Sequence, residues 1–368
     1  MMAAGGTGGH VIPALAVARE LRRRGHRPIF VGTRRGLESR LVSPEGFPVE
    51  FIEIGPLKRV GVLRAARTLA ELPLRVLEAR ALLKRWSPAA VFSMGGFAAG
   101  PVALAACLGR TPLVVMEPNV MPGFTHRWLA RHLTRALVSF PEAGRYFPPS
   151  KWEVTGLPVR QEFFELPVKP REEVLTVLIT GGSQGSRTLN EAARESWPLF
   201  RRGPVAVRLL HQTGWQAFAD LSEAFRSSGL EGEIVAFIDD MPGAFARSDL
   251  VVSRSGAGAV AELAAAGKPS ILVPFPYAAD EHQLRNAEAM AAAGAARLVP
   301  DREMTGARLY EEVTRLALEP GRLEAMGQAA RRLGRPQAAV RAADVLEEVA
   351  GGGRKGLTGG SGEENNTV

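Results

Sequence analysis

The stretch that decides the fold is Gly5-Gly6-Thr7-Gly8-Gly9-His10, close to the first residue. Apolar residues follow it at helical spacing up to Leu21, so the loop opens a helix. The amides of such a loop can approach an anion at the positive end of the helix dipole, and His10 could act as a base beside it. Far along the chain, a second glycine loop at 181–186 follows a buried-strand pattern at 174–179.

These two loops predict two nucleotide-fold halves. Neither loop has the Lys-Ser/Thr pair of a P-loop, and neither has the G-x-G-x-x-G spacing of a dinucleotide site. A purely structural turn therefore remains the alternative interpretation of each loop. Only Met1 to Ala4 precede the first loop, so the first strand should be short, either because this edge of the sheet is trimmed or because the true start lies upstream.

Composition and charge narrow the class of protein. The chain has 368 residues, enough for two domains of ordinary size, and its single cysteine, Cys107, excludes an internal disulfide framework and fits a reducing compartment. Residues 1–150 hold 21 Lys/Arg against 9 Asp/Glu, whereas the remainder holds 25 against 29. The first half is therefore the candidate surface for an anionic partner.

Two segments could be mistaken for membrane or targeting signals. Glycines and His10 interrupt the start before the apolar region of a secretory signal could form. The stretch 86–109 carries no charge, but its glycines and prolines divide it into a strand, a turn and a small-residue helix. We expect a buried strand–helix unit there.

Short apolar runs alternate with amphipathic stretches along the chain, which predicts a parallel sheet covered by helices in each half. The predicted strands, besides 152–155, are 29–32, 49–54, 89–93, 113–116, 136–140, 174–180, 205–212, 233–237, 250–253 and 270–274. We expect the boundary near Gly156-Leu157-Pro158, with domains at 1–157 and 158–335. An amphipathic helix at about 336–350 should pack on the body, and 351–368 should be disordered.

Further polar loops follow predicted strands, where open α/β sheets bind ligands. Met94-Gly95-Gly96-Phe97 follows one strand, and Arg254 to Gly258 follows another and places Glu262 one turn into a helix. A carboxylate there can accept hydrogen bonds from both hydroxyls of a ribose; the alternative is a favourable acid near a helix N-terminus.

Two polar groups near other strand ends also have open interpretations. The cluster Asp280-Glu281-His282-Gln283 with Asn286 suits a sugar better than a metal, because its acids and histidine are adjacent rather than spaced along one helix face. Glu117 and Asn119 could reach into a cleft, or Asn119 could simply form a turn before Pro122-Gly123.

The segment 58–86 mixes eight basic residues with two acidic ones and many apolar side chains. Such a segment can lie on an anionic membrane surface, although an ordinary solvated helix has the same pattern. Nucleic acid is a less suitable partner, because stacking aromatics are sparse and no binding signature is present.

Taken in order, these motifs resemble the MurG family of peptidoglycan-synthesis glycosyltransferases over about residues 3–350. The matching motifs are G-G-T-G-G-H, S-M-G-G-F-x-x-G-P, E-x-N, G-x-P-V-R, G-G-S-Q-G-S-x-x-L-N, F-I-D-D-M, R-S-G-A-x-x-x-x-E-L, V-P-F-P and Q-x-x-N-A. The resemblance implies a GT-B architecture, with two Rossmann-like α/β domains facing across a cleft and a C-terminal helix that returns to the first.

The resemblance also implies an activity, the inverting transfer of GlcNAc from UDP-GlcNAc to the C4 hydroxyl of MurNAc in lipid I, giving β-1,4-linked lipid II. UDP-GlcNAc would bind mainly the second domain and lipid I the first, with the enzyme peripheral on the cytoplasmic face of the bacterial plasma membrane. No fixed metal or cofactor is expected, and any Mg²⁺ would come with the UDP-sugar. The alternatives are another GT-B glycolipid glycosyltransferase, a UDP-GlcNAc 2-epimerase or a non-catalytic nucleotide-sugar sensor.

Residue roles follow from the same resemblance. His10 matches the position proposed as the base, Ser183 the phosphate-side serine, Ile238 the uracil contact, Glu262 the ribose contact and Gln283 the GlcNAc contact. The other donor-binding matches are Thr7, Gly8, Gly9, Asn119, Arg160, Ala257, Gly258, Ala259, Val260 and Ala261.

The chain departs from the family pattern at two loops. Where the family commonly reads H-E-Q-N, this chain has Met116-Glu117-Pro118-Asn119, so no role given to a histidine there should hold. The loop 280–282 before Gln283 is one residue longer than usual.

Overall fold

The computed structural model describes residues 1–5, 8–34, 36–55, 62–96, 99–167, 169–170 and 172–355. Within them the chain forms two compact units, one of Met1–Pro118, Pro122–Pro158 and the chain from Gln337, the other of Asn119–Met121 and Val159–Pro336. The chain thus passes from the first unit to the second after Pro158, beside the predicted division at 157/158. Residues 119–121 belong to the second unit, although the sequence places them in the first half.

The first unit is built on a parallel sheet of seven strands in the order β3-β2-β1-β4-β5-β6-β7. Its strands are β1 (Met2–Ala4), β2 (Phe30–Gly32), β3 (Val49–Phe51), β4 (Val91–Gly95), β5 (Leu113–Glu117), β6 (Arg135–Val138) and β7 (Trp152–Val154). Its helices are α1 (Gly8–Arg23), α2 (Glu38–Leu41), α3 (Val62–Trp86), α4 (Ala99–Leu108), α5 (Phe124–Leu129) and α13 (Ala338–Lys355).

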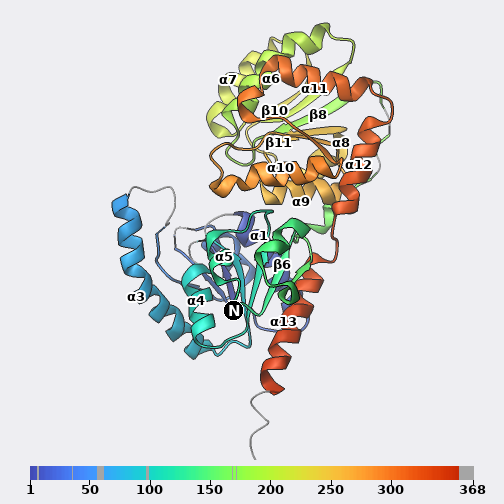
Figure 1. The fold of residues 1–368 in the computed structure, drawn as a ribbon. Helices are drawn as coiled ribbons and strands as arrows, with labels where there is room; N and C mark the ends of the chain where they lie inside the picture. The colour runs from blue at the N-terminus through green and yellow to red at the C-terminus, as the bar shows by residue number, and fades with distance from the viewer. Residues whose placement is uncertain are drawn as a thin grey trace, which may run out of the picture. The chain divides into compact units, whose positions relative to one another are not determined.

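The second unit repeats this plan with six parallel strands in the order β10-β9-β8-β11-β12-β13. Its strands are β8 (Leu175–Thr180), β9 (Val207–Gln212), β10 (Glu231–Val235), β11 (Leu250–Ser253), β12 (Ser270–Leu272) and β13 (Ala296–Leu298). Its helices are α6 (Arg187–Arg202), α7 (Trp215–Arg226), α8 (Met241–Arg247), α9 (Ala257–Ala266), α10 (His282–Ala292), α11 (Gly306–Leu318) and α12 (Arg322–Leu333). Figure 1 shows α6, α7 and α11 on one side of this sheet and α9 and α10 on the other.

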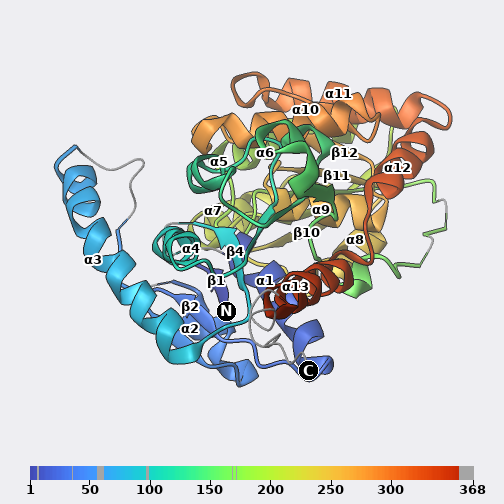
Figure 2. The same cartoon turned by 60° about the horizontal axis from the view of Figure 1, so that its bottom comes forward.

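Short 3₁₀ helices complete the connections at Ser43–Glu45, Pro141–Tyr146, Pro149–Lys151, Gln161–Phe163, Ala279–Glu281 and Asp301–Glu303. Each sheet has its own buried apolar core, made by strand residues and the inner faces of its helices. In the first unit α3 packs on α4, and α13 lies alongside α1 (Figure 2). The parallel sheets covered by helices confirm the predicted fold class.

Three predictions about elements need correction. β1 has only three residues, as expected, but it pairs with both β2 and β4 at the centre of its sheet, so the trimmed-edge explanation is wrong. Helix α13 continues to Lys355, so residues 351–355 of the predicted disordered tail are helical, and 356–368 lie outside the described residues. β13 was not predicted.

Candidate functional site

The strand orders define one topological switch point in each unit. β1 and β4 are neighbours in the first sheet, and β8 and β11 are neighbours in the second, but the chain proceeds from them toward opposite edges of the sheet. Loops that follow such strands diverge and leave a crevice at the carboxyl ends, where open α/β sheets bind ligands. The loops carrying Gly5 and Gly181 follow β1 and β8, so both lie at switch points.

His10 lies at the switch point of the first unit. It is the third residue of α1 and is half-buried, and it follows the half-buried Gly8 and the exposed Gly9 at the start of the same helix. The Gly95-Gly96 turn after β4 approaches it so closely that a Cβ on Gly96 would lie 2.7 Å from the Gly5 carbonyl oxygen and 3.5 Å from His10 Nδ1. The two loops are therefore in contact. Thr7, predicted to bind the donor, lies outside the described residues.

Glu117, the last residue of β5, does have a histidine partner. His126 of α5 lies with its Nδ1 2.8 Å from Glu117 Oε2, and both side chains are 2% exposed. The expectation about the motif histidine concerns position 116, where this chain has Met116, and it stays a prediction, because His126 reaches this loop from a different element. Sequence reasoning missed the pair because His126 stands nine residues beyond Glu117, outside the motif in which a histidine is usual.

The second glycine loop presents Ser183 to solvent. Its turn is closed by a bond from the Gly185 amide to the Gly182 carbonyl at 2.9 Å, and both glycines have positive φ angles. A Cβ on Gly185 would lie 1.9 Å from the Thr213 carbonyl oxygen, so only glycine fits there. Ser186 then caps α6 by accepting from the Leu189 amide at 3.3 Å, which leaves the loop at the positive end of the helix dipole.

A buried glutamine links this loop to the predicted uracil contact. Gln212, at the end of β9 and 1% exposed, donates to the Gly182 carbonyl at 2.8 Å and to Thr180 Oγ1 at 3.2 Å. Its Oε1 accepts from the Ile238 amide at 2.9 Å. Gln212 was not among the predicted site residues; the only sequence signal for it is an uncharged polar side chain that ends an apolar strand.

Hydrogen bonds and an ion pair also join the loop after β11 to neighbouring residues. Arg254 forms an ion pair with Asp301 and donates to Ser186 Oγ at 2.8 Å. Ser255 Oγ donates to the Gln283 carbonyl at 2.8 Å, and Gln283 Oε1 accepts from the Phe275 amide at 3.0 Å. The predicted donor residues 257–262 on α9 and Gln283 on α10 therefore lie around one loop.

Glu262 sits in the second turn of α9. Burial raises the pKa of its carboxyl to about 7, and the positive charge of Arg160 opposes this rise. Arg160 itself is exposed, with its guanidinium 5.2 Å from the centre of the Phe163 ring. A carboxyl with a perturbed pKa at the carboxyl edge of a sheet is typical of a functional site.

Asn119 is held by a residue that we had placed in the sugar-binding cluster. Asn286 is fully buried and donates to Asn119 Oδ1 at 3.1 Å and to the Ser255 carbonyl at 3.2 Å, while its Oδ1 accepts from the Val120 amide at 3.0 Å. Its amide is used within the protein, so Asn286 does not belong among the sugar contacts. These bonds place residues 119–121 with the second unit.

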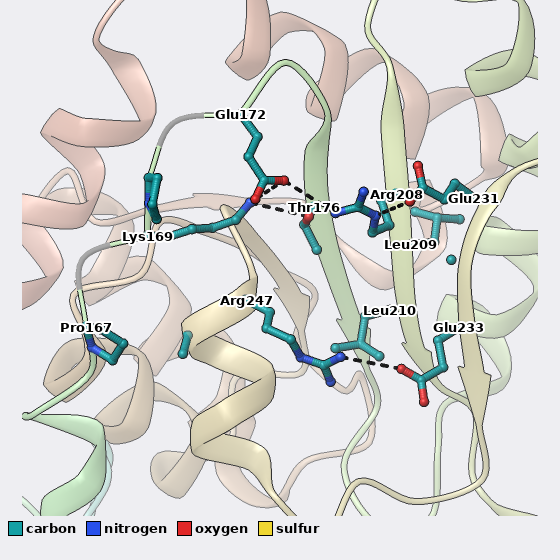
Figure 3. A pocket seen from close by; sticks show the side chains of 13 residues that line it. Pro167, Lys169, Glu172, Thr176, Arg208, Leu209, Leu210, Glu231, Glu233 and Arg247 are labelled. Carbon is teal, nitrogen blue, oxygen red and sulfur yellow. Dashed lines mark hydrogen bonds and ion pairs between the residues drawn. The ribbon is translucent and has the colours of Figure 1, made fainter.

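A pocket at the opposite edge of the second sheet does not fit a ligand site. It is lined by residues at or near the starts of β8, β9 and β10, including Thr176, Arg208 and Glu231. Figure 3 shows its charged side chains paired with one another, as in Arg208 with Glu231 and Arg247 with Glu233. Because these charged side chains already pair with one another, the pocket is poorly suited to bind a charged ligand.

Two kinds of feature are absent from the described ranges. No group of three or more His, Cys, Asp or Glu side chains is arranged to hold a metal ion there. Likewise, no helix in the described part of the chain combines the length and apolar character needed to cross a membrane.

Comparison with known proteins identifies the class. The glycosyltransferase family 28 N-terminal domain matches residues 1–138, and the glycosyltransferase family 28 C-terminal domain matches residues 176–346. Together with two Rossmann-like units that carry glycine loops at their switch points, these matches define a glycosyltransferase of the GT-B class.

The relatives define the family more closely. Over 350 residues, the chain is 61% identical to the UDP-N-acetylglucosamine--N-acetylmuramyl-(pentapeptide) pyrophosphoryl-undecaprenol N-acetylglucosamine transferase of Solibacter usitatus, covering 95% of this chain and 96% of that protein. The crystal structure of Acinetobacter baumannii MurG superimposes with a TM-score of 0.79 at 30% identity, covering 94% and 98% of the two chains. The chain belongs to the MurG family.

A UDP-GlcNAc 2-epimerase from Neisseria meningitidis shares the fold, with a TM-score of 0.64 at 15% identity, covering 94% of this chain and 99% of that one. At that identity the likeness shows the fold alone.

Proposed function

We propose that this protein transfers GlcNAc from UDP-GlcNAc to the C4 hydroxyl of MurNAc in lipid I and so forms β-1,4-linked lipid II for peptidoglycan. The observation that carries the proposal is 61% identity, over 95% of the chain, to a relative named for this transfer. The epimerase alternative has only the common fold in its favour.

The donor binds the second unit in this proposal. Ser183 and the amides of its loop hold the diphosphate at the start of α6, and Ile238 contacts the uracil. The Glu262 carboxylate accepts hydrogen bonds from the ribose, and Gln283 reads the GlcNAc hydroxyls. The bonds of Gln212 to Gly182 and Ile238, and of Arg254 to Ser186, support this assignment because they fix the loops relative to one another.

Catalysis is a single displacement with inversion. The MurNAc C4 oxygen forms a bond to the anomeric carbon of GlcNAc while His10 takes the hydroxyl proton. The bond from that carbon to the β-phosphate oxygen breaks, and UDP leaves with the electron pair. Loop amides, Ser183 and the α6 dipole stabilise the developing negative charge without a fixed metal ion.

The acceptor reaches the first unit from the membrane surface, so we propose a peripheral position on the cytoplasmic face of the plasma membrane. Helix α3 supports this, because Leu74 and Leu77 are 54% and 61% exposed and Arg80 and Lys84 continue the same outward-facing stripe. Residues 58–61 of the predicted membrane segment lie outside the described residues.

The decisive experiment measures transfer of radiolabelled GlcNAc from UDP-GlcNAc to a lipid I analogue, with UDP-GalNAc as the control donor. We expect label in the lipid fraction and one UDP released for each sugar transferred, with little transfer from UDP-GalNAc. Conversion of the sugar nucleotide without an acceptor would point to an epimerase, and transfer only to diacylglycerol would point to another glycolipid enzyme. Binding without any transfer would indicate a sensor.

A further inference from the structure

Three buried polar side chains meet beneath the carboxyl ends of β4 and β5 in the first unit. Ser93 lies on β4 and is fully buried, Glu117 ends β5, and His126 comes from α5. A polar group buried in this way is costly unless it is hydrogen-bonded, so the arrangement of its bonds is informative. None of the roles in the proposed transfer uses these side chains.

Their hydrogen bonds form a directed chain. The Gly95 amide donates to Ser93 Oγ at 3.2 Å, so the Ser93 hydroxyl can donate to His126 Nε2, 3.4 Å away. His126 then carries its proton on Nδ1 and donates to Glu117 Oε2 at 2.8 Å, which also accepts from the Gly123 amide at 3.1 Å. These bonds fit an imidazole of His126 that is protonated on Nδ1 and accepts a hydrogen bond on Nε2.

The imidazole of His126 also packs directly against the turn that touches His10. A Cβ on Gly95 would lie 3.2 Å from His126 Cε1, and the next residue, Gly96, approaches the Gly5 carbonyl and His10. Both glycines have φ angles near +80°, a conformation that other residues rarely adopt. The turn thus contacts His126 through Gly95, and Gly5 and His10 through Gly96.

We propose that His126 is a positioning residue that, through Ser93 and the Gly95-Gly96 turn, holds His10 in its working geometry. The inference rests on the proposed function, in which His10 is the base. His126 does not itself touch substrate, because it and Ser93 are buried. Its effect on rate is large nonetheless, since a displacement of about 1 Å at a reacting group costs about 100-fold in rate.

Two variants separate the contributions of His126. His126→Phe keeps an aromatic ring against Gly95 but removes both hydrogen bonds, whereas His126→Asn can keep a donor near the Nδ1 position. We expect His126→Phe to lower kcat by about 10- to 100-fold, with the KM for UDP-GlcNAc within about twofold, and His126→Asn to recover part of that loss. His132→Gln, an exposed histidine of the same segment, is the control and should keep wild-type kcat.

A double-mutant cycle distinguishes positioning from general destabilisation. If His126 acts through His10, His126→Phe should cause little further loss of kcat in the His10→Ala background. Equal losses in both backgrounds would overturn the inference while leaving the proposed transfer intact, and absence of transfer by the wild type would instead refute the proposed function. Should His126→Phe fail to fold, Ser93→Ala replaces it in the same cycle.

Nitrogen-15 NMR of the imidazoles gives a readout that does not depend on activity. The resonance that disappears in His126→Asn should show the Nδ1-protonated tautomer in the wild type and in Ser93→Ala, because Glu117 fixes it. An Nε2-protonated or rapidly exchanging imidazole would contradict the directed chain.

Discussion

At the scale of single residues, the proposed function gives the two glycine loops different roles. Ser183 is exposed at the start of α6, where the helix dipole favours a diphosphate. His10 is half-buried and packed against the turn after β4, which suits a side chain that must be held in one orientation. In the proposed function, the main role of the first loop therefore belongs to His10 rather than to the glycines before it.

The His10→Ala variant tests this division of labour. Loss of a general base should lower kcat by about 100-fold or more and leave the affinity for UDP-GlcNAc nearly unchanged, because the proton transfer occurs only in the transition state. Steady-state kinetics with a lipid I analogue measures kcat, and calorimetry measures donor binding. Wild-type turnover in His10→Ala would remove His10 from the role.

Glu262 predicts a pH dependence of donor binding. Its carboxyl has a pKa of about 7, raised by burial, and only the ionised form accepts hydrogen bonds from both ribose hydroxyls at full strength. Such a carboxyl is about one-tenth ionised at pH 6 and about nine-tenths at pH 8, so the affinity for UDP-GlcNAc should rise by about tenfold between these values. Calorimetry at several pH values provides the measurement.

The matched control for this prediction is Glu262→Gln, which has the same shape but does not titrate. It should bind the donor more weakly than the wild type at pH 8 and lose the rise in affinity between pH 6 and pH 8. Unchanged UDP-GlcNAc binding in Glu262→Ala would contradict the ribose assignment.

The residues that sequence alone could not identify are those whose partners lie far along the chain. Ser183 stands beside glycines that follow a strand, and Glu262 lies one turn into the helix that such glycines open, so the local pattern indicates both residues. Gln212 instead acts on Gly182 and Ile238, which are 30 and 26 residues away. His126 acts on Glu117 from a different element. Only the paired strands and packed helices bring such groups together.

At the scale of elements, ion pairs from an arginine that follows α1 hold helix α13 against the rest of the first unit. Arg24 donates to Asp344 and Glu347 on α13 and to Glu20 on α1, all at 2.7 Å. Buried Ala342, Val345 and other apolar residues complete the contact. The helix is therefore part of the first unit even though the whole second unit precedes it in sequence.

Removing this arginine should loosen α13. Arg24 is 18% exposed, and Arg24→Ala leaves two acids of α13 without this partner, so we expect the free energy of unfolding to fall by about 1 to 2 kcal/mol. Denaturant unfolding measures the loss, and hydrogen exchange should show faster exchange in α13. The control, Arg23→Ala, removes an arginine that pairs with Glu20 and is 72% exposed, and should leave stability unchanged. Equal stability of all three proteins would show that apolar packing alone holds the helix.

Two of the three-residue strands, β13 and β1, have features that the sequence did not predict. β13 has three residues with Arg297 at its centre, which breaks the apolar pattern. Its place in the sheet depends on pairing with β12 and on Glu312, which accepts from Arg297 Nε at 3.2 Å. β1 was predicted only to be short, and nothing in Met2–Ala4 indicates a central strand, because that place is determined by its pairing with β2 and β4.

At the scale of the whole molecule, the excess of basic residues in the first half is complementary in charge to a lipid-linked anionic acceptor. Opposite charge raises the local concentration of the protein at an anionic surface, and salt weakens the attraction because it screens exposed charges. Leu74 and Leu77 on α3 expose apolar area, which is unfavourable in water and favourable at a membrane interface. In the proposed peripheral position, charge and apolar contact make separable contributions to membrane binding.

Vesicle flotation tests both contributions. The protein should bind anionic vesicles more strongly than neutral ones, and added salt should reduce that difference. Replacing Leu74 and Leu77 together by serine should weaken binding to anionic vesicles by about 30-fold, because each leucine loses on the order of 1 kcal/mol of apolar burial at the interface. The control is Leu318→Ser, a leucine of α11 in the second unit that is 58% exposed and should leave flotation unchanged. Equal flotation with anionic and neutral vesicles, insensitive to salt, would show that the basic surface of the first half does not bind the membrane.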